Sequence, residues 1–179
     1  MGILQKVRLN EGEGQMPEKD TIERARRDAE EGKSPSTQAG EFVREEIHHV
    51  REGVHGARSV KQAIAIGLSK ARRAGVNLQP PAKGKASNAV RSKAARDLAK
   101  AGRRHKASKN RSEATLAALE RERKDTASHN ALAAQARASS RKRGPAQRHR
   151  SSMKAVRTKG VEGLRRAAKK AARSRNTSR

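Results

Sequence analysis

Two overlapping Glu-x-x-His motifs hold the residues of this sequence that are best suited to binding a metal. Glu45 and His48 form the first motif, and Glu46 and His49 form the second. On a helix this spacing places a carboxylate and an imidazole on the same face, as in the di-iron sites of helical bundles. However, the first pair falls on the polar face of the expected helix, and the next expected helix supplies no carboxylate. A second copy of the chain would be needed to complete a site, so the favoured interpretation is a solvated polar face with no metal and no other cofactor.

Basic side chains are the second group with clear chemistry, and they are concentrated in the C-terminal half. Residues 1–81 contain 14 Lys+Arg and 12 Asp+Glu, whereas residues 82–179 contain 30 and 6. Such an excess of cations attracts nucleic acid, because neutralising phosphates releases condensed counterions. The residues of this region that we predict to bind nucleic acid are Arg103, Arg104, Lys106, Arg141, Lys142, Arg143, Arg148, Arg150, Arg165, Arg166, Lys169 and Lys170.

These basic clusters are expected to contact mainly phosphate. No aromatic residue is interleaved with them, so bases have no side chain on which to stack. Binding should therefore be weakly sequence-selective and strongly dependent on salt. An anionic membrane is a poorer partner, because the region lacks the Trp, Phe and Leu face of interfacial helices. No apolar run approaches the ~18 residues of a membrane span.

Sequence-specific reading of DNA would require the two central helices to form a helix-turn-helix. The second of these helices, with the residue just before it, carries five cations that could contact DNA: Arg58, Lys61, Lys70, Arg72 and Arg73. The expected loop between the helices has six residues, more than the three to four of that motif. A helical hairpin with polar flanks is the favoured interpretation, and the helix-turn-helix remains the alternative.

Enzymatic chemistry has little support in the sequence. Cysteine is absent, which excludes thiolate nucleophiles, disulfides and Cys-based zinc sites. The other histidines are scattered among cations, and no Ser/His/Asp set, phosphate-binding glycine loop or acid pair has a supporting context. We therefore expect a protein that is not an enzyme.

The elements that must position these residues begin with a helix expected over residues 38–52. Five of its apolar residues fall in one arc about 140° wide. They are Ala39, Phe42, Val43, Ile47 and Val50. Glu46 lies inside the same arc, which predicts a lysine or arginine partner for it on the next helix.

A second central helix is expected over residues 59–74. Its start has a capping box between Ser59 and Gln62, and Gly75 follows its last periodic residue. Four small residues on its apolar stripe should allow the facing helix to approach closely: Ala63, Gly67, Ala71 and Ala74.

Both helices belong to a small helical module expected over residues 16–81. A shorter helix should precede them from about Thr21 to Glu31, with capping-box spacing over residues 20–23. Residues 1–15 are expected to be a disordered extension, and one hypothesis is that translation begins at Met16.

The remaining region, residues 82–179, is expected to be a largely disordered basic tail. Leu, Ile, Val and Phe number 24 of 179 residues. That is below the ~20% at which a highly charged chain is expected to be disordered. The tail has nine Leu, Val and Met residues for four helix-capable segments, at 87–101, 112–123, 128–143 and 161–172. We expect these segments to be transient helices that gain helicity when phosphates neutralise their charge.

One stretch of the module carries a family resemblance. It covers residues 33–78 and contains KSPSTQAGEFVREEIHHVREG and GARSVKQAIAIGLSKARRAGV. This stretch resembles an uncharacterised family of small basic bacterial proteins that is catalogued as a domain of unknown function. Some members are labelled plasmid-stabilisation or DNA-binding proteins, so the resemblance implies association with DNA and supplies no catalytic residues. The tail segment TLAALERERKDTASHNALAAQARASSRKRG is similar to the family's tail, and the tail's composition also resembles linker-histone tails and bacterial histone-like proteins.

Together these features predict a mainly α-helical, histone-like protein that binds nucleic acid, with DNA favoured over RNA. The expected fold is a small helical hairpin module followed by a long, largely disordered basic tail rich in Ala, Lys and Arg. The expected location is the bacterial cytoplasm, at the nucleoid, and no membrane partner is expected. Two alternatives remain, namely an RNA- or ribosome-associated protein and a phage or plasmid structural protein. In the second alternative, residues 34–78 would self-associate or bind a protein partner.

Overall fold

The computed structural model describes residues 17–101 and 108–177. The predicted disordered extension, the proposed start at Met16 and three predicted binding residues (Arg103, Arg104 and Lys106) lie outside those ranges. Within them the chain is helical and contains no strand, apart from one isolated bridge between Lys83 and Ala86. The predicted mainly α-helical class is thus confirmed for the described residues. Contacts divide the chain into two compact units, residues 1–132 (the first unit) and 133–179 (the second unit).

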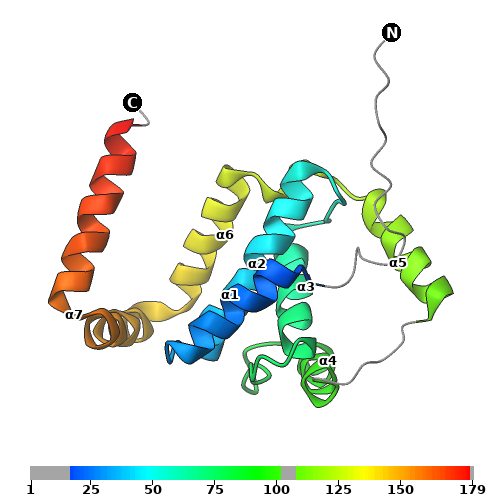
Figure 1. The fold of residues 1–179 in the computed structure, drawn as a ribbon, viewed down its shortest axis with the longest axis horizontal. Coiled ribbons are helices and arrows are strands. Elements are labelled where there is room, and N and C mark those ends of the chain that lie inside the picture. The colour runs from blue at the N-terminus through cyan, green and yellow to red at the C-terminus, as the bar shows by residue number, and fades with distance from the viewer. Residues whose placement is uncertain (1–16, 102–107, 178–179) are drawn as a thin grey trace, which may run out of the picture. The chain divides into compact units, whose positions relative to one another are not determined.

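Three helices form the core of the first unit. They are α1 (Lys19–Glu30), α2 (Pro35–Glu52) and α3 (Val60–Arg73), and both α1 and α3 pack against α2 (Figure 1). The apolar arc predicted on α2 is buried at Ala39, Phe42, Ile47 and Val50 and partly buried at Val43. The predicted packing of the two central helices is therefore confirmed.

Gly67 is a point of close approach between α2 and α3. A Cβ atom at this position would lie 2.7 Å from the Cα of Val43 and 2.9 Å from the carbonyl oxygen of Phe42. Both neighbours belong to the α2 backbone, so they cannot move aside without separating the helices. The small residues predicted on this stripe do permit a close approach, although Ala74 itself is exposed.

The ends of α2 and α3 follow local sequence signals. Ser59 Oγ accepts a hydrogen bond from the backbone N–H of Gln62 at 3.3 Å, as the predicted capping box requires. Each helix ends at a glycine with positive φ, Gly53 (75°) and Gly75 (101°). The next N–H after each glycine bonds five residues back, from Val54 to His49 and from Val76 to Ala71, which is a Schellman ending.

Two helix starts differ from the sequence-based expectation. α2 begins at Pro35, three residues before the expected Gln38, because proline suits the first turn of a helix. α1 begins at Lys19 after Glu18, and no side chain caps it. The capping box predicted over residues 20–23 is therefore wrong, because those residues already lie inside the helix.

The predicted largely disordered tail is also wrong for the described residues. Beyond residue 82 the chain forms α4 (Asn88–Ala99), α5 (Lys109–Glu120), the short 3₁₀ helix η1 (Asp125–Ala127), α6 (His129–Lys142) and α7 (Gly144–Thr177). Disorder was predicted because this region has few apolar residues that could form a core. Alanine, arginine and lysine are among the strongest helix formers, so these segments are helical while burying almost no side chains.

Part of the predicted tail completes the core of the first unit. Ala127 of η1 is buried with Ile47, Val50, Ala57 and Ala63, and Leu132 packs against the same cluster. The backbone N–H groups of the loop between α2 and α3 donate to this segment, Gly56 to Leu119 (2.9 Å) and Ala57 to Arg123 (3.0 Å). Side-chain bonds add to the contact, among them one from Arg51 Nε to the Ala127 carbonyl at 2.9 Å. All of these hydrogen bonds end on backbone carbonyl oxygens, which leave no periodic pattern in the sequence.

α4 covers one side of α3. Ser69 Oγ donates to Asp97 Oδ2 at 2.7 Å, and Ala94 of α4 is buried. No helix among the described residues is long and apolar enough to cross a membrane.

Candidate functional site

Exposed cations dominate the second unit. Residues 133–179 contain 16 Lys+Arg and a single acidic residue, Glu162, whereas residues 1–132 contain 28 Lys+Arg and 17 Asp+Glu. The nine predicted binding residues in this unit are all exposed to solvent: Arg141, Lys142, Arg143, Arg148, Arg150, Arg165, Arg166, Lys169 and Lys170. The acidic residue of the second unit pairs with one of them, since Glu162 Oε1 lies 3.1 Å from Arg165 Nη1.

Six of these nine cations lie on α7, which consists of two helical segments. Gly160 has non-helical dihedral angles (φ 64°, ψ 173°) and breaks the helix between residues 144–159 and 161–177. At 1.5 Å per residue, the second segment is roughly 25 Å long. Arg165, Arg166, Lys169 and Lys170 occupy successive turns of that segment, so they present a continuous positive surface. Such a surface can contact several phosphates at once.

The five cations predicted at α3 fall into two groups. Arg58, Lys61 and Arg73 are exposed, but Lys70 and Arg72 are only 3% and 7% exposed. Arg72 Nε donates to the carbonyl oxygen of Leu78 at 2.9 Å, and burial lowers the pKa of Arg72 below its ordinary value. We therefore correct the prediction for Lys70 and Arg72, because their charges are used inside the first unit and do not face a ligand.

The elements that pack against α3 argue against the helix-turn-helix alternative. Seven residues, Gly53–Ser59, separate α2 from α3, and Ala57 of this loop packs against Ala127 of η1. Ser69 lies under α4 through its bond to Asp97. A helix that reads bases needs a free face to enter the major groove. α3 is buried against α2 on one side and carries α4 on another, so this geometry favours the hairpin interpretation.

A buried ion cluster lies between α2 and α3. Lys70 Nζ is 2.9 Å from Glu46 Oε2 and 3.4 Å from Glu45 Oε1. His55, from the loop, approaches the other Glu46 oxygen with its Nε2 at 3.1 Å. The lysine partner predicted for Glu46 on the next helix is thus confirmed. The contacts to Glu46 are ion pairs with poor hydrogen-bond angles, since neither carboxylate oxygen has a well-directed donor among the described residues.

The charges of this cluster shift two pKa values in opposite directions. Burial opposes the ionisation of Glu46, but the nearby His55 and Lys70 outweigh it, so the pKa of Glu46 lies below its ordinary value. The contact with Glu46 raises the pKa of His55 against the effect of burial. Both shifts favour the charged pair.

The residues of the two Glu-x-x-His motifs lie in different environments. His48 of the first motif is exposed and lies 3.8 Å from Glu52, as expected for a polar face, although Glu45 is buried. Glu46 of the second motif is buried, and His49 lies at its edge with its Nε2 3.1 Å from Glu18 Oε1. The solvated polar face predicted for these motifs is therefore wrong at Glu45 and at Glu46, and the burial of Glu46 agrees instead with its place in the apolar arc. Sequence reasoning missed His55, because a loop residue has no periodicity to indicate that it turns inward.

Comparison with known proteins adds no assignment. The chain matches no protein-family model, no curated protein and no solved structure. The resemblance to small basic bacterial proteins therefore stays a prediction, and the site must be interpreted from its own geometry.

Proposed function

We propose that this chain is a non-enzymatic, histone-like protein that binds nucleic acid through phosphate contacts of its second unit. The observation that carries the proposal is the 16 Lys+Arg against one acidic residue in the 47 residues of this unit, whose nine predicted binding cations are all exposed. Exposed cations that far outnumber the carboxylates of the same unit attract a polyanion and release its condensed counterions on binding.

DNA is the partner that we propose first. A helix with cations on successive turns can follow a duplex backbone without reading base edges, so binding would be weakly sequence-selective. The described residues of the second unit contain no aromatic side chain for base stacking, which separates this mode from single-strand binding. In this role the protein would act at the bacterial nucleoid, in the cytoplasm, and would compact DNA by neutralising it.

Salt dependence of binding tests the proposal. The affinity of the full chain for a duplex of mixed sequence should be measured across a series of salt concentrations. If about eight phosphates are neutralised, the slope of log affinity against log salt should be near −7. Replacing Arg165, Arg166, Lys169 and Lys170 together by glutamine should reduce the magnitude of that slope by roughly 3–4.

A matched charge-conserving variant serves as the control. The double variant Arg165→Lys and Arg166→Lys keeps the charge and should keep the slope of the parent chain. A slope close to zero for the parent, or an unchanged slope in the glutamine variant, would reject the electrostatic mechanism. Competition between duplex DNA and structured RNA then decides the partner, since stronger competition by RNA would favour the ribosome- or RNA-associated alternative.

A further inference from the structure

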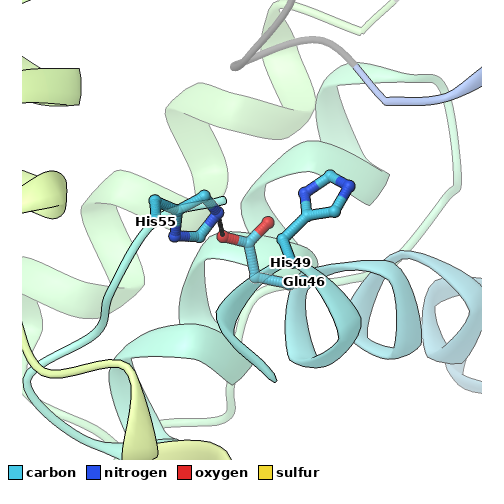
Figure 2. A group of neighbouring side chains, drawn as sticks. All are labelled: Glu46, His49 and His55. Carbon is cyan, nitrogen blue, oxygen red and sulfur yellow. Dashed lines mark ion pairs between the residues drawn. The ribbon is translucent and has the colours of Figure 1, made fainter. Parts of the chain in front are cut away.

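We propose that Glu46, His49 and His55 form a binding site for a divalent transition-metal ion, with Zn²⁺ the best fit. Their ligand atoms all lie within 4.8 Å of one another. Figure 2 shows the two α2 side chains and the loop histidine turned toward one another. Two imidazoles and one carboxylate are a ligand set that Zn²⁺ uses, with its fourth position left to water or another ligand. The proposal reverses the sequence-based expectation of no metal and is independent of nucleic-acid binding.

The first argument for a metal site is the hydrogen-bond partner of the ring nitrogen that each histidine turns away from the cluster. His55 Nδ1 lies 3.1 Å from the carbonyl oxygen of Gly56, which can only accept, so this nitrogen carries the proton. His49 Nε2 lies 3.1 Å from the Glu18 carboxylate, which favours a proton there as well. Each ring then offers its other nitrogen to the cluster. Histidines that bind metals nearly always donate their second N–H to a carboxylate or a backbone carbonyl in this way.

His49 Nδ1 supplies the second argument. This nitrogen is buried and has no hydrogen-bond partner among the described residues. A buried polar atom without a partner is costly, so native proteins usually satisfy it. The ion pairs of Glu46 with Lys70 and His55 do not involve this nitrogen and leave it unexplained. A metal ion shared with Glu46 would satisfy it.

One pair of ligand atoms has the spacing that a single ion requires, and the third ligand atom lies within 4.8 Å of both. His55 Nε2 and Glu46 Oε1 are 3.1 Å apart. Zn–N and Zn–O bonds of about 2.0–2.1 Å at tetrahedral angles place neighbouring ligand atoms roughly 3.3 Å apart. The His49 and His55 rings are nearly perpendicular, with an interplanar angle of 83° and centroids 5.8 Å apart, so neither ring blocks the other's approach.

Charge balance is the third argument. Three carboxylates, those of Glu18, Glu45 and Glu46, contact the two imidazoles or Lys70. Lys70 is the only ammonium in this set, and it faces the second oxygen of Glu46 rather than the one near His55. Binding of the ion would displace the Nε2 proton that His55 carries in its charged pair with Glu46. With both imidazoles then neutral, the set carries a net charge of −2, which a divalent cation neutralises. The ion would tie α2 to the loop before α3 and thereby stabilise the first unit.

Metal titration of the full chain tests the proposal. After chelator treatment and its removal, Zn²⁺ should bind with a stoichiometry of one in calorimetry. Saturating Zn²⁺ should raise the midpoint of thermal unfolding by about 5–10 °C. Co²⁺ should give visible absorption bands of a low-coordinate site, and the NMR signals of His49 and His55 should shift before those of the other histidines.

Three substitutions separate this site from casual binding at surface histidines. His49→Gln and His55→Gln should each weaken Zn²⁺ binding by at least about 10–100-fold, and Glu18→Gln by about 10-fold. His48→Gln, beside the site but exposed, should leave affinity and the thermal shift unchanged. His49 is less buried than His55, so its variant remains informative if His55→Gln unfolds, and circular dichroism checks both. Absence of saturable binding by the parent chain, or equal losses in the His48 and His49 variants, would overturn the proposal.

Discussion

Lys70 Nζ lies 2.9 Å from Glu46 Oε2, and the two side chains are only 3% and 1% exposed. This contact joins α3 to α2 through charge in a position where an apolar pair would be ordinary. Glu45 shares the same ammonium at 3.4 Å. One cation therefore offsets two buried carboxylates, and the stability of the first unit depends on it.

Replacing Lys70 by methionine should destabilise the protein strongly. The substitution keeps most of the side-chain volume but leaves two buried carboxylates without their cation. Breaking a buried ion pair from one side typically costs about 3–5 kcal/mol. Urea unfolding in the presence of a chelator measures the free energy of unfolding without a contribution from metal.

Two variants control the Lys70 experiment. Lys61→Met, at an exposed position of the same helix, should change stability by less than about 0.5 kcal/mol. The double variant Glu46→Gln with Lys70→Met should lose less than the sum of the single losses, because it removes both charges of one contact. Equal effects at Lys61 and Lys70 would show that the buried pair does not hold the helices together.

The close approach at Gly67 predicts opposite outcomes for two glycine-to-alanine substitutions. Gly67→Ala should destabilise the protein by about 1–3 kcal/mol, because the new methyl group overlaps the α2 backbone. Gly40→Ala, inside α2 with nothing within 4 Å, should stabilise it by about 0.5–1 kcal/mol. Thermal and urea unfolding of both variants provide the comparison. A stabilising effect at Gly67 would contradict the tight helix contact.

Docking of residues 119–127 on α2, α3 and the loop between them predicts slow hydrogen exchange in that loop. The N–H groups of Gly56 and Ala57 donate to the carbonyls of Leu119 and Arg123, so they should be protected in the full chain. Ala127→Asp places a charge in a buried position and should speed their exchange at least tenfold, equivalent to about 1.4 kcal/mol.

An exposed alanine provides the control for that exchange experiment. Ala118 lies on the exposed side of α5, so Ala118→Asp should leave the protection of Gly56 and Ala57 unchanged. Fast exchange of both amides in the parent chain would mean that residues 119–127 do not dock in solution.

Asp125 should titrate below the ordinary range of an aspartate. Arg123 holds its carboxylate with two contacts, Nη2 to Oδ2 at 2.6 Å and Nε to Oδ1 at 3.0 Å. These hydrogen bonds lower the pKa of Asp125 from its ordinary value of 3.8. The Arg123–Asp125 pair therefore stabilises the folded state at pH values above the ordinary pKa of aspartate. This stabilisation is lost as the pH falls through the lowered pKa of Asp125 in the folded state.

NMR titration of the Asp125 carboxyl carbon measures this pKa directly. In the variant Arg123→Gln the midpoint should return toward the ordinary value, because the charged donor has gone. A midpoint that is the same in both proteins would show that the ion pair does not persist in solution.

Much of the core arrangement was predictable from local patterns. The apolar arc over residues 38–52, the small residues that face it and the Ser59 cap rely on periodicity and side-chain chemistry within one helix. The same periodicity placed Glu46 inside the arc. A buried carboxylate needs an opposite charge, so this position indicated a cationic partner. Lys70 is that partner. Local pattern also indicated the exposed cations of the second unit, which bury nothing and need no tertiary contact to place them.

The sequence by itself determined the helical class, the two central helices and the uneven charge, because helix propensity, amphipathic period and net charge are properties of neighbouring residues. Only the tertiary structure decided that residues 119–132 join the core, that Lys70 and Arg72 turn inward and that His55 meets Glu46 and His49. The physical reason is that these contacts join residues as many as 76 positions apart, largely through backbone carbonyls and single charges. Such contacts leave no repeat along the chain, and their energy depends on burial that exists only once the helices have packed.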